Sequence, residues 1–111
     1  MITIETVRKI ALSFEGAVEL PHSDKTSFRI KKRIFATLNV KENRACIKLS
    51  PIDQHVFSSF DKTVIYPVPN KFGTQGWTLI SLQNVHEEMF TDAITCAFQF
   101  VTTRFGVRMK S

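Results

Sequence analysis

The sequence predicts an α+β fold of two layers, in which one antiparallel sheet of about five strands packs against helices. Three observations predict it. Apolar residues recur at helical spacing towards both ends of the chain, and they alternate with polar residues at strand spacing in between. The third is size, since 111 residues that are 43% hydrophobic, with ten Phe, suffice for one core. We therefore expect a single domain over residues 1–111, with the element order α-β-β-β-α-β-β-α.

The N-terminal region has the pattern of an amphipathic helix over about residues 3–13. Thr3 is a favourable N-cap, because its hydroxyl can accept a hydrogen bond from a free backbone N–H of the first turn. Gly16 follows the helix, and glycine often ends helices because it adopts left-handed backbone angles without a Cβ clash. One face carries apolar residues at three- and four-residue spacing: Ile4, Val7, Ala11 and Phe14.

Between Ala17 and Leu49 the apolar period shortens towards two, which predicts three antiparallel strands and a further short piece around 18–21. The turns are expected at 31–33 and 41–43, both short and charged. The alternation assigns seven residues to the face that meets the helices: Phe28, Ile30, Ile34, Ala36, Leu38, Ile47 and Leu49. It assigns six residues to the opposite face: Arg29, Lys31, Phe35, Thr37, Cys46 and Lys48.

The second half of the chain should add a short helix, two strands and a long final helix. Ser50 as N-cap, Pro51 at the first helical position and Asp53 in the first turn predict a helix that ends near Phe60. Strands over 63–66 and 77–82 flank a Pro- and Gly-rich segment, 67–76, which we expect to be an irregular loop. The final helix, about 86–104, precedes a frayed tail at 107–111, and its apolar stripe comprises Met89, Phe90, Ala93, Ile94, Ala97, Phe98, Val101 and Phe105.

Motifs along nearly the whole chain resemble the MmcQ/YjbR family. They are, in order, Thr3-x-Glu5-x-Val7-Arg8, Gly16 with Glu19 and His22, Phe28-Arg29-Ile30, Ile34-Phe35-Ala36-Thr37-Leu38, Ile47-Lys48-Leu49, Pro69-x-Lys71-x-Gly73 and Gly76-Trp77. The resemblance implies a fold likened to CyaY and to secretion chaperones, and DNA binding through a "double wing" arrangement. One departure is that the family often has a Trp soon after the Lys of the late loop, whereas here Phe72 follows Lys71 and Trp77 comes later.

Positive charge is concentrated on the predicted sheet. The chain has a net charge of +5, and eight of its fifteen Lys and Arg residues lie between Lys25 and Lys48, with Glu42 as the one acid among them. Such a surface attracts polyanions, and an aromatic ring on it could stack on an exposed base. We therefore predict a non-enzymatic, nucleic-acid-binding (DNA-binding) protein whose contacts come from a basic hairpin and sheet face: Arg29, Lys31, Lys32, Arg33, Phe35 and Lys48.

Three other interpretations stay open. The basic face could simply be solvated, with its charges discouraging edge-to-edge aggregation of the sheet. The protein could be a protein-interaction or chaperone-like module that uses a sheet edge or an apolar-aromatic face, as the resemblance to secretion chaperones implies. It could also bind a small anionic ligand near the 67–76 loop, and the candidate ligand-binding residues are then Lys71, Trp77 and His22.

Other classes of function have no support in the sequence. The three His and two Cys residues are not at ligand spacing, so we expect no metal site, no disulfide and no cofactor. Neither Ser58-Ser59 nor the cysteines lie in the motif of an activated nucleophile, so we expect no catalytic residues. Without a signal-peptide pattern or a long apolar run, we expect a cytoplasmic protein that does not associate with membranes. Its partner would be nucleic acid or a protein, and it would be a monomer or a weak homodimer.

Overall fold

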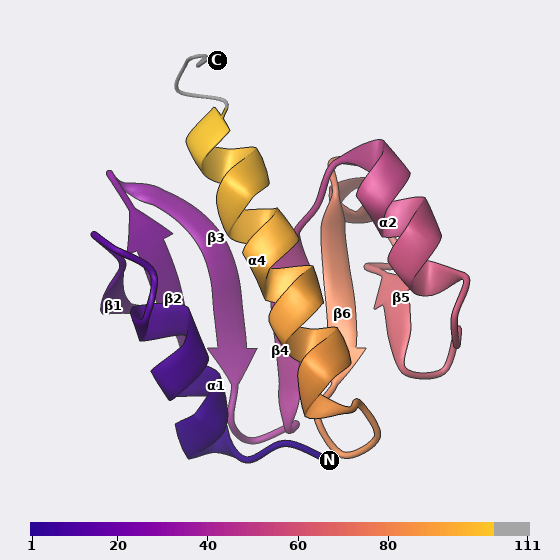
Figure 1. Ribbon diagram of the computed structural model, residues 1–111, viewed down its shortest axis with the longest axis horizontal. Coiled ribbons are helices and arrows are strands. Elements are labelled where there is room, and N and C mark those ends of the chain that lie inside the picture. The colour runs from indigo at the N-terminus through magenta and orange to yellow at the C-terminus, as the bar shows by residue number, and fades with distance from the viewer. Residues whose placement is uncertain (104–111) are drawn as a thin grey trace.

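Six strands form one antiparallel sheet, and three helices cover one of its faces (Figure 1). The structure is a computed structural model that describes residues 1–103. The elements are α1 (Ile4–Leu12), β1 (Val18–His22), β2 (Lys25–Ile30), β3 (Arg33–Asn39), β4 (Arg44–Lys48), α2 (Pro51–Ser58), β5 (Ile65–Pro67), α3 (Lys71–Thr74), β6 (Trp77–Ser81) and α4 (Glu87–Thr103). The strand order is β1-β2-β3-β4-β6-β5, and every neighbouring pair is antiparallel. The predicted α+β fold is thus confirmed.

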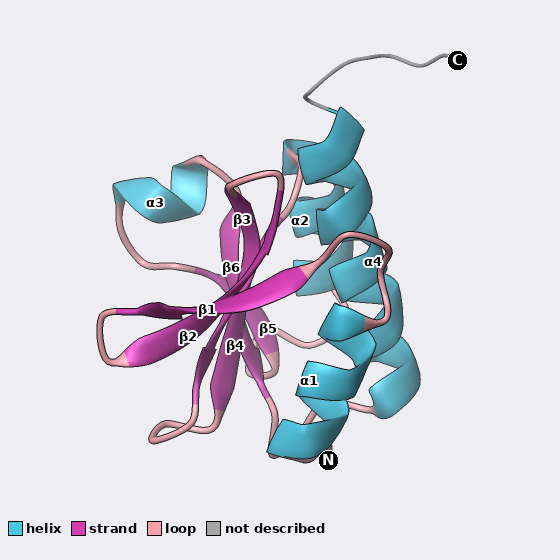
Figure 2. Ribbon diagram, turned by 90° about the vertical axis from the view of Figure 1, so that its left-hand side faces the viewer, coloured by secondary structure: helices cyan, strands magenta, loops and turns pink. Residues whose placement is uncertain are grey.

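The two sides of the sheet differ. Figure 2 shows α1, α2 and α4 on one side, while α3 and the β1–β2 hairpin extend on the other. The buried hydrophobic residues come from the sheet face that meets the long helices and from those helices themselves. We call the opposite side of the sheet its open face. Within residues 1–103, none of the helices is both long and apolar enough to cross a membrane.

One element goes beyond the prediction. Strand β1 is the short piece expected around 18–21 and brings the number of strands to six, where about five were expected. Helix α3, however, occupies part of the segment predicted to be an irregular loop. The loop prediction was wrong for these four residues because Asn70 caps them, its side-chain oxygen accepting a hydrogen bond from the Phe72 backbone N–H at 2.8 Å. The expected helix end at Arg104, the contribution of Phe105 and the frayed tail at 107–111 lie outside the described residues.

Side-chain caps begin both helices for which the sequence predicts them. The hydroxyl of Thr3 accepts a hydrogen bond from the Thr6 backbone N–H at 3.1 Å, and that of Ser50 accepts one from Asp53 at 3.1 Å. Each cap provides a partner for one of the backbone donors that the first helical turn leaves unpaired. The predicted starts of α1 and α2 are therefore confirmed by the hydrogen bonds that define them.

A β-bulge in β3 reverses the predicted direction of two side chains. Phe28 pairs with Ala36, yet the next residue of β2, Arg29, pairs with Ile34, so Phe35 is an extra residue in its strand. Phe35 is consequently fully buried on the helical side, and Ile34 faces the open side. The prediction that Phe35 projects away from the helices is wrong, as is the prediction that Ile34 packs against them. Strict alternation fails because the bulge adds one residue to the period.

Phe35 joins the sheet to two helices through an aromatic cluster. Its ring centroid lies 5.9 Å from that of Phe14, which follows α1, and 5.3 Å from that of Phe98 in α4, both in edge-to-face geometry. Phe14 and Phe98 stack on each other at 4.5 Å. Aromatic pairs in these arrangements contribute about 0.5–1.5 kcal/mol beyond the area they bury. The bulge therefore places an aromatic ring where the two helices meet.

We predict that Phe35→Ala lowers the free energy of unfolding by about 3–5 kcal/mol, because it leaves a cavity beside the rings of Phe14 and Phe98. The matched control is Phe72→Ala, which removes a ring that is 48% exposed and should change stability by less than about 1 kcal/mol. Urea denaturation followed by circular dichroism measures both. Equal effects of the two substitutions would contradict the bulge.

Candidate functional site

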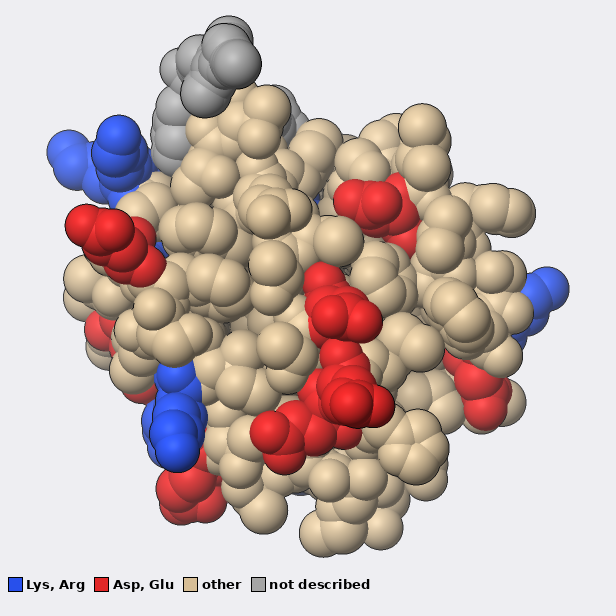
Figure 3. All heavy atoms as spheres, viewed as in Figure 1, with Lys and Arg blue, Asp and Glu red and all other residues tan. Residues whose placement is uncertain are grey.

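Acidic side chains gather on two of the helices, and basic side chains gather on the sheet. Figure 3 shows the helix-covered face, where acidic residues gather over α4 and Lys and Arg atoms lie mainly at the margins. Helices α2 and α4 carry Asp53, Glu87, Glu88 and Asp92 and no Lys or Arg, whereas β2–β4 and their turns carry eight Lys and Arg residues. Helix α1 is mixed, with Glu5 beside Arg8 and Lys9. The sheet and its turns therefore carry much of the positive charge of the molecule.

The acids near the sheet are engaged by neighbouring cations. Glu19 of β1 accepts a hydrogen bond from the Nε of Arg8 in α1 at 3.1 Å. Glu42 forms an ion pair with Arg44, the first residue of β4. Asp24 in the β1–β2 turn has a carboxylate oxygen 3.8 Å from the Nζ of Lys25. The eight Lys and Arg residues of β2–β4 and their turns outnumber these three acids.

The β2–β3 turn places two lysines at the tip of the basic hairpin. Lys31 and Lys32 have φ values of 50° and 71°, so both adopt left-handed backbone angles. Two-residue hairpin turns need such angles to match the twist of the strands, and they usually contain Asn-Gly. Left-handed backbone angles cost a residue other than glycine about 1–2 kcal/mol. The turn therefore holds two lysines in a strained backbone conformation, and such strain is concentrated at functional sites.

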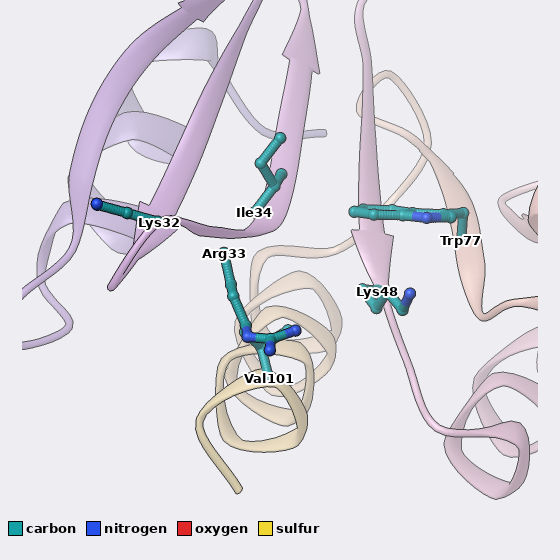
Figure 4. A pocket seen from close by; sticks show the side chains of 6 residues that line it. All are labelled: Lys32, Arg33, Ile34, Lys48, Trp77 and Val101. Carbon is teal, nitrogen blue, oxygen red and sulfur yellow. The ribbon is translucent and has the colours of Figure 1, made fainter. Parts of the chain in front are cut away.

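A hollow of about 360 Å³ lies behind this turn, at the end of the sheet where β3 and β6 begin and β4 ends. Its lining comprises Lys32, Arg33, Ile34, Lys48, Trp77 and Val101. Figure 4 shows Arg33 extending towards Val101 of α4, Lys48 lying beside the Trp77 ring, and Lys32 pointing away from that ring. We call Lys32, Arg33, Lys48 and Trp77 the basic edge.

The Lys48 ammonium packs on the Trp77 ring, with its Nζ 5.2 Å from the ring centroid. The two residues are opposite each other in the β4–β6 pair, which fixes this arrangement. Such a cation–π contact contributes about 0.5–1 kcal/mol at exposed sites. Since Trp77 is half-buried, part of its ring is accessible beside a positive charge.

The backbone around Trp77 is held in place from two sides. The side-chain amide of Gln54 in α2 donates a hydrogen bond to the Gly73 carbonyl at 2.9 Å, and the Leu49 N–H donates to the Gly76 carbonyl at 2.9 Å. Gly76 has a φ of 106°, and a Cβ there would lie 2.2 Å from the Leu49 carbonyl oxygen. No other residue type fits this position without moving the backbone. The position of Trp77 is therefore determined by the fold.

A second and larger hollow, of about 680 Å³, lies on the open face, and we call it the cup. Its floor is formed by strand residues Ile34, Thr37, Cys46 and Leu79. The β1–β2 hairpin contributes His22 and Lys25 to one side, and the segment around α3 contributes Val68, Pro69 and Phe72 to another. Arg44, Tyr66 and Trp77 complete the lining. The cup and the hollow at the basic edge adjoin, because both are lined by Ile34 and Trp77.

The thiol on the floor of the cup is held in its neutral form. Burial raises the pKa of Cys46 to about 11, and the charges of Lys25 and Arg44 only partly oppose this effect. A protonated thiol is a weak nucleophile and a poor metal ligand. Among residues 1–103 no group of three or more His, Cys, Asp and Glu side chains could hold a metal ion. The Cys46 thiol is therefore poorly suited to nucleophilic attack or to metal binding.

The predicted site residues separate into several groups. Lys32, Arg33, Lys48 and Trp77 come together at the basic edge, next to Lys31 in the turn, whereas Phe35 is in the core. Arg29 is half-buried, and its Nε donates a hydrogen bond to the Ser27 hydroxyl at 2.8 Å. His22 and Trp77 line the cup, but Lys71 lines neither of these two hollows.

Sequence reasoning missed four residues of the cup: Lys25, Arg44, Tyr66 and Phe72. One signal could have found Arg44, because it lies two residues before Cys46 and hence on the same face of the strand. The others lacked such a signal, since Lys25 reaches the cup through the pairing of β1 with β2, Tyr66 through that of β5 with β6, and Phe72 through the unpredicted α3.

The fold has a relative among solved structures. The crystal structure of protein DR2400 from Deinococcus radiodurans, described as a DUF419 domain, is similar with a TM-score of 0.82 and 18% sequence identity. The similarity covers 97% of this chain and 84% of that chain. No family model matches the sequence, and no curated protein matches it. At this identity the likeness shows a shared fold and does not transfer a function.

We predict that Cys46 reacts slowly with iodoacetamide and that its rate keeps rising with pH to about 11, because only the thiolate reacts. At pH 8 about 0.1% of such a thiol is ionised, compared with about a quarter of an ordinary one. Allowing for the greater nucleophilicity of a more basic thiolate, the rate should be roughly twenty-fold below that of glutathione. Peptide mapping by mass spectrometry separates Cys46 from Cys96. A plateau in the Cys46 rate near pH 9 would contradict the prediction.

Proposed function

We propose that this protein binds nucleic acid without catalysing a reaction on it, and that the basic edge is the contact surface. The observation that carries the proposal is one hollow lined by Lys32, Arg33 and Lys48 together with Trp77, whose ring packs against Lys48. Cations of this kind bind phosphates, and an aromatic ring among them can stack on an unpaired base. Trp77 thus takes the stacking role that the sequence analysis gave to Phe35.

The charge distribution supports the same proposal at longer range. A molecule with acids on α2 and α4 and bases on its sheet has a field that favours the approach of a polyanion from the side of the sheet. The strand ends and the β2–β3 turn would therefore meet the polyanion first. The lysines in left-handed conformation at the turn add support, because they keep positive charge at that position despite its cost.

We also propose membership of the MmcQ/YjbR family and a cytoplasmic location. The motifs quoted above support the family, and the fold shared with DR2400 is compatible with it. The DNA binding that this resemblance implies is in turn compatible with the basic edge. The geometry itself carries no base-specific contact pattern, so we expect affinity for DNA and RNA with little sequence preference.

We predict that the triple variant Lys32→Gln, Arg33→Gln, Lys48→Gln loses at least about tenfold in affinity, to the same extent for all sequences, because phosphate contacts carry no base information. Fluorescence anisotropy with labelled single-stranded and duplex DNA and RNA, measured over a range of salt concentrations, tests this. The slope of log K against log salt should fall in magnitude by about two to three.

The matched control removes three exposed charges elsewhere, with Lys9→Gln, Lys41→Gln and Lys62→Gln. It changes the net charge by the same amount and should leave most of the affinity in place. Equal losses in the two variants would mean that net charge alone governs binding, and the basic edge would then be rejected. Binding of wild-type protein that is insensitive to salt would reject the proposed function itself.

We predict that Trp77→Leu weakens binding to single strands by about 1–3 kcal/mol and affects duplex binding less, because only unpaired bases can stack on the ring. Trp77 is the only tryptophan in the chain, so single-stranded oligonucleotides should also quench the intrinsic fluorescence of the wild type. Circular dichroism verifies that the variant is folded. Unchanged Trp77 fluorescence at saturating oligonucleotide would exclude stacking.

A further inference from the structure

The cup on the open face has the size and shape of a small-molecule site. Its volume of about 680 Å³ is well within the range of about 300–1,000 Å³ that ligand pockets occupy. Figure 2 shows the β1–β2 hairpin and α3 extending from the open face, and residues from both line the cup beside those of the sheet. The proposed nucleic-acid contact at the basic edge does not use this volume.

One end of the cup is aromatic. Trp77 begins β6, and Phe72 of α3, which is 48% exposed, lines the same cavity. A large apolar ring left in water at a concave site is a common feature of ligand pockets, since a ligand that covers it removes apolar surface from water. Flat aromatic surfaces are best covered by another planar ring.

The other end of the cup is cationic. Arg44 pairs with Asn39 in the sheet, and Lys25 lies one residue beyond the Thr26–Leu38 pair, so the register puts both cations in neighbouring positions along the strands. Both cations line the same cavity as Cys46. Lys25 lies 3.8 Å from a carboxylate oxygen of Asp24 and Arg44 pairs with Glu42, but neither acid is among the described residues that line the cup.

The Arg44 guanidinium lines the cup and has donors left for a further acceptor. One terminal nitrogen lies 3.5 Å from the Tyr66 hydroxyl, and the other pairs with Glu42. Each of these two nitrogens carries two N–H groups, so an anionic group bound at this end would accept hydrogen bonds from the remaining ones.

The two ends are separated along β4 and β6. The Arg44–Ser81 pair and the Lys48–Trp77 pair are four residues apart on each strand, which corresponds to about 13 Å. Between them, Thr37, Cys46, Leu79 and Tyr66 are in one row across the sheet and form a largely apolar floor. An occupant that satisfies both ends is therefore elongated, flat and charged at one end only.

We infer that the cup binds a small planar aromatic anion, with its ring system against Trp77 and Phe72 and its acidic group at Lys25 and Arg44. A carboxylate, sulfonate or phosphate would satisfy the cationic end equally well. The site is distinct in ligand class from the basic edge, although Trp77 and Ile34 border both.

Two fluorescent probes of matched shape test the inference on the intact protein. 8-Anilinonaphthalene-1-sulfonate is anionic, and N-phenyl-1-naphthylamine has the same aromatic framework without the charge. We expect one sulfonate per chain, bound at least about tenfold more tightly than the amine, with energy transfer from Trp77 to the bound probe. Lys25→Gln with Arg44→Gln should remove that tenfold advantage and leave amine binding unchanged. A tenfold difference corresponds to about 1.4 kcal/mol.

Three further variants locate the binding. Thr37→Phe fills the floor with a residue that favours strands and should abolish binding of both probes, provided thermal melting shows a folded protein. Lys41→Gln with Lys62→Gln removes two exposed charges away from the cup and should change neither affinity. The Lys32, Arg33, Lys48 triple variant should also retain sulfonate binding, which separates this site from the basic edge. If this triple variant lost affinity for nucleic acid but kept its affinity for the sulfonate, both proposals would stand independently.

Several results would overturn the inference. Equal affinities for the two probes would contradict the inference that the cup prefers an anion. Sulfonate binding that survives in folded Thr37→Phe would mean that the probe binds outside the cup. Failure of wild-type protein to bind either probe would show that the cup does not take aromatic ligands of this size. None of these results depends on whether the protein binds nucleic acid.

Discussion

The β-bulge at Phe35 is the constraint on which the rest of the structure depends. It inserts one residue into β3, so Phe35 turns into the core and Ile34 turns to the open face. The buried ring contacts Phe14 and Phe98 and thereby fixes α1 and α4 against the sheet. On the other side, Ile34 borders both hollows. A bulge also bends its strand and increases the local twist of the strand pair.

Trp77 connects the two candidate sites. Its backbone follows Gly76, whose left-handed angles and close approach to Leu49 leave no room for a side chain, and Gln54 of α2 ties the same segment to the helical layer. The ring is therefore positioned by the fold before any ligand arrives, which lowers the entropic cost of binding. The ring borders both hollows.

The distribution of charge between the layers gives these hollows their chemical character. Acids in α2 and α4 leave the sheet with much of the positive charge, and the acids near the sheet pair with Arg8, Lys25 and Arg44. At the basic edge, cations and one aromatic ring line a hollow at the ends of strands, which suits the polyanion that we propose. In the cup, two cations lie at one end of a largely apolar cavity, which suits the planar anion that we infer.

The local chemistry of the sequence determined the helices and strands, the Thr3 and Ser50 caps, and the concentration of positive charge around a hairpin turn. These features depend on residues close together in the chain, since capping and periodicity act within a few residues. Only the tertiary structure decided which way Phe35 and Ile34 point, because an extra residue in a strand is visible only against its partner strand. It also assembled the cup, in which His22, Arg44 and Phe72 come from distant segments that strand register and α3 bring together.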